Sequence, residues 1–448
     1  MNGQTSRRGF LSALAVAGAG ALALDGCSSG SSGSTGAAGN ATVAVPSKDP
    51  TATINVTSIL ALKADQMQAV LDAFHAAHPT ITVNWRTVPF DSLSSTIDAN
   101  VANKQGDPDV YWADQPRLSA VAARGEARDL TAAFSRYESS FDPSPWKSGL
   151  YQGKVFGLPI ANSTQLLYYN KTLLSKAGLT PPSSDVSGRM TWEQLTADAA
   201  KATKAGAANG FLFGQPNRYY QLECLPVSLG GSAGASGKDN LTPDFTSPAW
   251  VKAMTWYGSL YSSGVSPRNV SADQTDPAFL AGKTAYMVEG PWLLPQLQAS
   301  KIDWGIAPQP TFAGGKPVTA DGSWSLAINP FSKNPDAAAV FLKWMAIDGG
   351  SGYIKYRTSP ELAANVAGKK VYFAKPVFAS AEGKKAAQII AYETANTGVN
   401  RVSTIGYLEF ETILNAAFSD ISNGTPAQQA LESASTKLKT AWAKYAGK

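Results

Sequence analysis

The sequence predicts an α/β fold with two lobes, each built on a mostly parallel sheet that helices flank. Stretches that alternate apolar and polar residues, as strands do, are followed repeatedly by stretches with apolar residues at helical spacing. This order is typical of domains with parallel sheets, and it recurs in both halves of the chain. With 448 residues and 44% hydrophobic content, the chain can bury two cores.

The first half shows the alternation of strands and helices most clearly. Val70, Leu71 and Phe74 share one face of a predicted helix, which Pro79 ends. The predicted order is strand 51–60, helix 63–79, strand 80–88, helix 91–104, strand 108–114 and helix 116–125.

The same order returns in the second half. Thr191 is placed to cap an amphipathic helix, and Leu431, Leu438 and Trp442 share one face of the last helix. Predicted helices or strand–helix units cover residues 151–179, 190–206, 276–292, 332–347 and 425–446. Tryptophans at helical spacing are expected in the core, namely Trp192, Trp250, Trp256, Trp344 and Trp442.

A Gly-Pro-Trp sequence follows one of the predicted strands. Pro291 cannot extend a sheet ladder and Gly290 frees the backbone, so the strand must end and turn there. This turn presents Trp292 at the edge of an element, where a large aromatic side chain can face a ligand.

The first 27 residues predict export and attachment to a membrane. Thr5–Leu11 resembles a twin-arginine export motif, because two adjacent arginines precede an apolar stretch. That stretch, Gly9–Leu24, spans only about 24 Å as a helix, which favours a signal peptide over a membrane span. Leu24–Cys27 resembles a lipobox, so we expect residues 1–26 to be removed and Cys27 to carry lipid.

The sequence offers few residues for metal binding or catalysis. No cysteine or His/Glu cluster accompanies His75 and His78, so no metal site is expected. No Gly-x-Ser-x-Gly motif occurs. The basic residues are scattered and the formal net charge is +5, which gives nucleic-acid binding little support. We therefore expect neither an enzyme nor a cofactor.

Six segments, in order along the chain, resemble the extracellular solute-binding proteins of ABC importers, specifically the sugar-binding family that includes maltose-binding protein. Trp292 falls in the segment that resembles the Gly-Pro-Trp signature of this family. The matching segments are Ala73–Trp85, Gly106–Thr131, Gly153–Leu179, Thr191–Leu195, Ala278–Trp292 and Ser325–Met345.

The resemblance implies a two-lobe periplasmic-binding-protein fold of type II, in which the chain crosses between the lobes at Pro159–Gln165 and Ala307–Thr311. Ligand would bind in the cleft and stabilise the closed form by contacting both lobes. The implied segments are a flexible tether at 27–49, lobe one at 50–160 and 311–358, and lobe two at 161–310 and 359–448, including the C-terminal helices.

The resemblance also implies a function. Such a protein would capture a carbohydrate, here a di- or oligosaccharide, and deliver it as a monomer to the transmembrane subunits of an ABC permease. Lipid on Cys27 would anchor it to the outer face of a bacterial cell membrane.

The candidate ligand-binding residues combine aromatic rings with polar groups, because sugars present C–H-rich faces and a belt of hydroxyls. Trp112 and Asp114 end a predicted parallel strand, where α/β sheets place ligands. The resemblance implies that Trp292 stacks on the sugar. The other candidates are Asn162, Arg218, Tyr219, Tyr220, Glu289, Asp321 and Trp324; which of the two tyrosines faces the cleft is left open.

Two alternatives remain open. The same fold could bind a charged solute, such as a phosphodiester or a polyamine, if Arg357 and Arg401 pointed into the cleft; otherwise both arginines are expected to be solvated or ion-paired. A glycan hydrolase would need two carboxylates about 5–10 Å apart, and Asp114, Glu289 and Asp321 are candidates for them.

Overall fold

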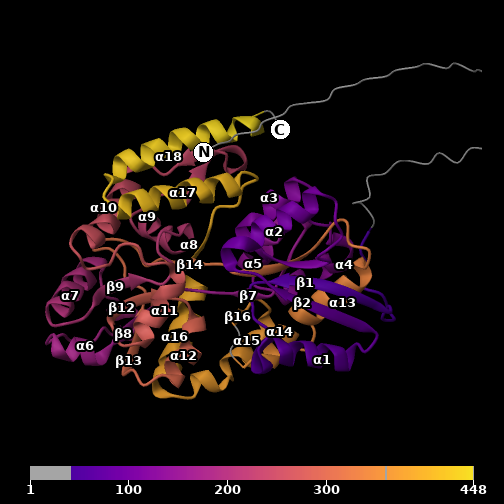
Figure 1. Ribbon diagram of the computed structural model, residues 1–448, viewed down its shortest axis with the longest axis horizontal. Coiled ribbons are helices and arrows are strands. Elements are labelled where there is room, and N and C mark those ends of the chain that lie inside the picture. Colours follow the sequence, from indigo (N-terminus) through magenta and orange to yellow (C-terminus); the bar gives the residue numbers. More distant parts are fainter. Residues whose placement is uncertain (1–41, 359–360, 447–448) are drawn as a thin grey trace, which may run out of the picture. The chain divides into compact units, whose positions relative to one another are not determined.

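The computed structural model describes residues 42–358 and 361–446. The predictions of a signal peptide and of lipid on Cys27 lie outside the described residues. Within them, a five-stranded sheet and a four-stranded sheet, each with its helices, make up most of the fold, and four two-stranded sheets accompany them (Figure 1). The prediction of an α/β architecture with two sheets is confirmed.

Sheet I has five strands in the order β2-β1-β3-β15-β6. β1 pairs in parallel with β2 and β3, whereas β15 runs antiparallel to β3 and β6. The strands are β1 Ala52–Ser58, β2 Ile81–Thr87, β3 Val110–Asp114, β6 Leu158–Pro159 and β15 Trp324–Ile328. In Figure 1 the indigo strands β1 and β2 lie beside the orange helix α13, because a late part of the chain returns to this sheet.

Sheet II has four strands in the order β13-β8-β12-β9. β12 is parallel to β9 and antiparallel to β8, and β8 is also antiparallel to β13. The strands are β8 Leu166–Asn170, β9 Asn209–Phe213, β12 Thr284–Glu289 and β13 Trp304–Pro308.

Two connections carry the chain between the sheets. The first crossing, residues 160–165, leads from β6 to β8, and the second crossing, residues 309–323, leads from β13 to β15. The second crossing is longer than the predicted 307–311. Short strands bind the crossings to later parts of the chain: β7 Ala161–Asn162 pairs with β16 Leu362–Ala363, and β14 Thr319–Asp321 pairs with β17 Gly398–Asn400.

The expectation that each sheet is mostly parallel is wrong. A parallel neighbour requires a crossover that returns to the same end of the same sheet. β8 and β15 instead arrive from the other sheet through the crossings, and each runs antiparallel to both of its neighbours. Periodicity in the sequence identifies such strands but not the direction from which they enter.

Helices cover both sheets and form a separate layer near the C-terminus. On sheet I, α13 packs on β1 and β15; on sheet II, α7 packs on β9 and β12, and α16 on β13. Thr191 caps α7 as predicted, accepting a hydrogen bond from the Gln194 N–H at 3.1 Å. Helices α10, α17 and α18 pack on one another, with Leu431, Leu438 and Trp442 buried as predicted.

The bounds of the helices fall into two sets. In the first half they are α1 Ala69–Ala77, α2 Phe90–Ala102, α3 Leu118–Ala123, α4 Thr131–Phe134, α5 Pro143–Ser148, α6 Lys171–Lys176, α7 Trp192–Lys204, α8 Tyr219–Leu222 and α9 Cys224–Ser228. In the second half they are α10 Pro248–Ser262, α11 Ala272–Leu280, α12 Leu294–Ala299, α13 Pro335–Ala346, α14 Gly352–Tyr356, α15 Val366–Phe373, α16 Ala381–Asn396, α17 Tyr407–Ser422 and α18 Ala427–Trp442. Small hairpins are formed by β4 Leu150–Tyr151 with β5 Lys154–Val155, and by β10 Gly234–Ser236 with β11 Thr242–Asp244.

The end of the predicted tether belongs to the folded part of the chain. Val43 is buried in the hydrophobic cluster that contains the core of sheet I, and Asp49 Oδ2 lies at hydrogen-bond distance, 2.7 Å, from His78 Nδ1. Burying an apolar side chain such as Val43 is favourable because it removes the side chain from water. The flexible tether therefore ends before residue 49.

Candidate functional site

A groove lies where the carboxyl ends of strands from both sheets meet. A cavity of about 580 Å³ shares five wall residues with a second cavity of about 60 Å³, so the two form one groove. The shared residues are Phe90, Gln215, Trp292, Ser323 and Trp324. The segment after β1, the end of β3, the segment after β9 and the turn after β12 all reach this groove, which is the edge where α/β sheets place ligands.

The Gly-Pro-Trp turn is built to present Trp292. β12 ends at Glu289 and a short 3-10 helix, η6 Pro291–Leu293, follows at once. A Cβ atom on Gly290 would lie 2.1 Å from the Trp292 ring, so only glycine allows the ring to fold back here. The Gly290 carbonyl accepts a hydrogen bond from the Tyr168 hydroxyl at 2.9 Å. Trp292 is half-buried and lines both cavities.

Aromatic groups of sheet I lie on the same groove. Trp324 begins β15 and packs edge-on against Phe90 at the start of α2, with ring centroids 5.7 Å apart. Phe90 is 42% exposed, and the Arg218 guanidinium lies 4.6 Å from its ring centre. The groove therefore has flat apolar surfaces from both sheets together with a planar donor group.

A buried ion pair forms part of the groove wall. Asp114 ends β3, and Arg401 follows β17 and binds it through two hydrogen bonds of 2.7 and 2.5 Å. The Arg401 guanidinium also lies 4.9 Å from the ring centre of Tyr220. Burial works to lower the pKa of Arg401, but Asp114, Tyr407 and Glu411 together outweigh it and hold this pKa well above its ordinary value.

Two further ion pairs contribute groove residues. Arg357 donates to Glu361 at 2.7 Å, and both line the larger cavity. Glu411 lines the smaller cavity, where Arg117 binds it and Arg401 Nη1 lies 3.9 Å from its Oε1. The expectation that Arg357 and Arg401 are ion-paired is confirmed, although both also face the groove.

The structure brings together five of the predicted residues, Asp114, Arg218, Tyr220, Trp292 and Trp324, as groove walls. The open choice between two tyrosines is resolved by α8. Tyr220 meets the groove, with its hydroxyl 2.6 Å from Ser163 Oγ, whereas Tyr219 is fully buried and packs edge-on against Phe410.

Trp112 and Glu289 are placed below the groove. Trp112 is 1% exposed and packs edge-on against Trp85 and Tyr353, so it belongs to the core of sheet I. Glu289 is 2% exposed and accepts a hydrogen bond from the Gly290 N–H at 2.8 Å. Burial, with a smaller contribution from Asp276, raises the pKa of Glu289 well above its ordinary value. Neither side chain is in position to contact a ligand in the groove.

Asn162 and Asp321 lie in the crossings. Asn162 Oδ1 accepts the Gly322 N–H at 3.1 Å and so holds the two crossings together. Asp321 lines a third cavity of about 120 Å³, which shares Gly322 and Arg401 with the smaller groove cavity, and it accepts a hydrogen bond from the Ser144 hydroxyl at 3.1 Å. Burial raises the pKa of Asp321 to about 6.

The raised pKa of Asp321 predicts a pH-dependent stability. Because the folded value is about 6 and the ordinary value is 3.8, the folded state alone holds this proton between those values. The contribution is complete below pH 3.8 and is lost as the pH rises through 6. Between pH 7 and 4, the wild type should gain up to about 3 kcal/mol relative to Asp321→Asn. Urea unfolding of both proteins at each pH measures this difference, and parallel pH profiles would contradict it.

Among the groove residues that the sequence did not single out are Phe90, Gln215, Ser163, Glu361 and Glu411. Phe90 follows Pro89 at the start of a helix and is exposed there. The sequence feature that points to it is an aromatic residue directly after a proline that begins a helix. Gln215 comes two residues after β9, at the same strand end as the candidates Arg218 and Tyr220.

Residues 42–358 and 361–446 contain neither a group of metal ligands nor a membrane-spanning helix. No group of three or more His, Cys, Asp or Glu side chains could hold a metal ion there. No helix in the same ranges has the length and hydropathy needed to cross a membrane.

Solved structures show that this chain has the fold of ABC substrate-binding proteins. The GacH receptor of Streptomyces glaucescens, solved unliganded and with acarbose, is 22% identical with a TM-score of 0.73, over 87% of this chain and 98% of that chain. A substrate-binding protein of Listeria monocytogenes in complex with cycloalternan is 21% identical with a TM-score of 0.74, over 87% and 97%. The predicted fold class is confirmed.

The family is shown by the sequence itself. A model of the bacterial extracellular solute-binding proteins matches residues 61–350, and the chain belongs to this family. A maltodextrin-binding protein of Bacillus subtilis is 28% identical over 59% of this chain and 62% of its own length. A maltooligosaccharide ABC transporter solute-binding lipoprotein of Streptococcus pneumoniae is 26% identical over 61% and 64%. The chain thus matches less than two thirds of the length of either relative.

Proposed function

We propose that this protein captures a neutral di- or oligosaccharide in the groove and delivers it, chemically unchanged, to the permease of an ABC importer. The observation that carries the proposal is that Trp292, in the turn after β12 of sheet II, lines a single groove with Trp324 of β15 in sheet I and Phe90 at the start of α2. Flat aromatic surfaces suit the C–H faces of sugar rings. The names of the relatives, which bind maltodextrin or maltooligosaccharide, support the same ligand class.

The ion pairs favour a neutral ligand over a charged one. Arg357 and Arg401 do face the groove, as the charged-solute alternative requires. Each is already bound to a carboxylate, Glu361 or Asp114. A charged ligand would have to displace that partner and leave a buried charge without compensation, which is costly. Hydroxyl groups can instead share the remaining donors and acceptors without breaking either pair.

The same pairs weigh against a glycan hydrolase. Of the carboxylates that line the groove among the described residues, Asp114, Glu361 and Glu411 are each bound by an arginine. Asp65 is exposed at the rim. A hydrolase needs two carboxylates flanking the bond, one to donate a proton and one to attack or to activate water.

The N-terminal sequence supports a proposal for where the protein is located. We propose export by the twin-arginine route, acylation of Cys27 and attachment as a monomer to the outer face of the cell membrane. The relative from Streptococcus pneumoniae is named a lipoprotein, which supports this proposal.

A thermal-shift screen of the mature domain tests the proposed ligand class. We expect neutral oligosaccharides, maltodextrins among them, to raise the melting temperature, because a ligand at 100 times its Kd adds about 2.7 kcal/mol of stability. Phosphodiesters, polyamines and uronic acids serve as the charged comparison. A shift with charged solutes alone would refute the neutral-sugar proposal, and release of cleaved products would identify a hydrolase.

A further inference from the structure

A pocket of about 300 Å³ lies at the carboxyl end of β9, between the ends of α10 and α17 (Figure 1). We call it the sheet II pocket and define it by six of its wall residues, Asn217, Tyr261, Asn269, Val270, Ser419 and Asn423. None of the described residues that line it belongs to either groove cavity. Its volume is at the lower end of the range for small-molecule sites, so it suits a single ring better than a chain of rings.

The segment that follows β9 contributes to both the groove and the sheet II pocket. Gln215 and Arg218 line the groove, whereas Pro216 and Asn217 line the sheet II pocket. The two sites are therefore neighbours along the chain but have separate walls. The described walls of the sheet II pocket all come from β9, α10, α17 and the segments after them, so a ligand there needs no contact with sheet I.

Two tyrosines fix the direction of the hydrogen bonds in this pocket. The Tyr257 hydroxyl donates to Asn217 Oδ1 at 2.8 Å and accepts from the Asn217 N–H at 3.0 Å, and its third contact is the Tyr261 hydroxyl at 2.8 Å. Because Tyr257 has given its one proton to Asn217, Tyr261 must donate to Tyr257. Tyr261 is only 9% exposed but lines the pocket, so its oxygen is left to accept a hydrogen bond from a ligand.

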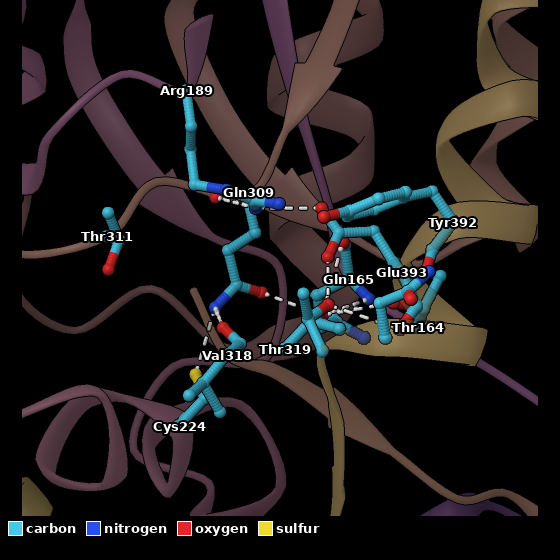
Figure 2. Close-up of polar contacts among 12 residues, drawn as sticks. Thr164, Gln165, Arg189, Cys224, Gln309, Thr311, Val318, Thr319, Tyr392 and Glu393 are labelled. Carbon is cyan, nitrogen blue, oxygen red and sulfur yellow. Dashed lines mark hydrogen bonds and ion pairs between the residues drawn. The ribbon is translucent and has the colours of Figure 1, made fainter. Parts of the chain in front are cut away.

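Other polar groups of the sheet II pocket are free to bind a ligand. In the crossings, by contrast, the protein satisfies its own hydroxyls: the Thr319 hydroxyl lies 3.0 Å from the Thr164 hydroxyl and accepts the Gln165 N–H at 3.0 Å (Figure 2). The Asn269 side-chain amide and the Ser419 hydroxyl have no hydrogen-bond partner among residues 42–358 and 361–446. Donors and acceptors without a protein partner therefore meet at one cavity.

The pocket is also neutral. No acidic or basic side chain is among the described residues that line it. The charged residues within two positions of a wall residue are exposed or line the groove, namely Arg218, Arg268, Asp273 and Asp420. A charged ligand would leave water without gaining a compensating charge, and an apolar ligand would cover amides and hydroxyls without replacing their hydrogen bonds. A neutral ring with many hydroxyls satisfies the polar groups, while its C–H face can lie against Pro216 and Val270.

We propose that the sheet II pocket is a second binding site, which takes one neutral, polyhydroxylated ring such as a hexopyranose. This inference goes beyond the function proposed for the groove and does not depend on it. A single ring makes few contacts, so we expect a Kd of about 1 mM. At that affinity the pocket stays nearly empty while a micromolar titration fills the groove.

Methyl-resolved NMR of the mature domain tests the proposal, because each site has a methyl group in its wall. Val270 reports on the sheet II pocket, and Leu60 reports on the larger groove cavity. The neutral probes are methyl α-glucoside, methyl α-galactoside and methyl α-mannoside, and the charged probes are glucuronate and glucosamine. We expect at least one neutral probe to give a saturable shift at Val270, whether or not an oligosaccharide fills the groove.

Asn269→Gly removes one amide from the pocket and keeps the backbone, because Asn269 has a φ of 60° and glycine adopts this left-handed conformation freely. Asn240→Gly is the matched control, since Asn240 has a φ of 52° and lies outside the pocket. We expect Asn269→Gly to weaken the binding seen at Val270 about three- to tenfold, and Asn240→Gly to leave it unchanged.

Tyr261→Phe is a second variant, which removes only the hydroxyl whose oxygen faces the ligand. Tyr111→Phe is its control, because the Tyr111 hydroxyl is also buried and donates to the Glu126 carbonyl at 2.8 Å, outside the pocket. We expect Tyr261→Phe to weaken binding by a similar factor and Tyr111→Phe to have no effect on it.

Three results would overturn the proposal. They are the absence of a saturable shift at Val270 up to about 20 mM of every neutral probe, tighter binding of a charged probe, and wild-type affinity in both Asn269→Gly and Tyr261→Phe. Val270 and Leu60 are read separately in the same spectra. Failure of the groove to bind saccharide would therefore appear at Leu60 alone and is distinguishable from failure of this proposal.

Discussion

Replacing Asp114 with alanine should lower the free energy of unfolding by about 3–5 kcal/mol and abolish detectable saccharide binding. Asp114 holds Arg401 through two hydrogen bonds, and Arg401 is buried. Without the carboxylate, the buried guanidinium loses both hydrogen bonds to Asp114 and keeps the more distant Glu411, 3.9 Å from its Nη1. The same change removes an acceptor from the groove wall, so stability and binding fall together.

Chemical unfolding and calorimetric titration measure the two effects of Asp114→Ala. Asp303→Ala is the control, because the Asp303 side chain is 66% exposed and its 3.5 Å pair with Lys171 is screened by water. We expect this control to change stability by less than about 1 kcal/mol and to leave binding intact. If Asp114→Ala unfolded at the wild-type denaturant concentration, the pair would not hold the groove as described.

Replacing Trp292 with alanine should weaken saccharide binding at least about tenfold, or about 1.4 kcal/mol, with only a small change in stability. The ring is half-buried on the groove wall, so its removal takes away contact area for the ligand more than it takes away core packing. The effect on binding should grow when Trp324, on the facing sheet, is replaced as well.

Tyr137→Ala is the matched control for Trp292. Tyr137 is also a half-buried aromatic residue, but it packs on Phe134 and lines neither groove cavity. Its variant should bind saccharide with wild-type affinity. A Trp292→Ala protein that binds normally while it unfolds more easily would show that Trp292 is a packing residue.

Local chemistry made most of the fold predictable from the sequence. Thr191 caps a helix because its hydroxyl reaches the Gln194 N–H, and Pro291 ends β12 because proline has no N–H to continue the ladder. The direction of β8 and β15 was not predictable in this way. The direction depends on how the chain crosses between the sheets, which the local sequence pattern does not predict.

A site residue was predictable from the sequence where it lies at or directly after the carboxyl end of a predicted strand. Asp114 and Trp292 follow that rule and line the groove. Trp112 does not follow it, because β3 is buried over its whole length. A tryptophan inside a buried strand looks the same in the sequence whether it packs in the core or contacts a ligand. The partner of Arg401 is 287 residues away in the sequence, so the ion pair is visible only in the folded chain.

The most direct test of the central claim is a calorimetric titration of the mature domain with the neutral saccharide that gives the largest thermal shift. We predict saturable binding of one saccharide per chain, which is lost in Asp114→Ala, weakened at least about tenfold in Trp292→Ala and preserved in Tyr137→Ala. Saturable binding that is equally strong in the Asp114 and Trp292 variants would place the ligand elsewhere. Binding of charged solutes alone would contradict the assignment of the groove to neutral oligosaccharides.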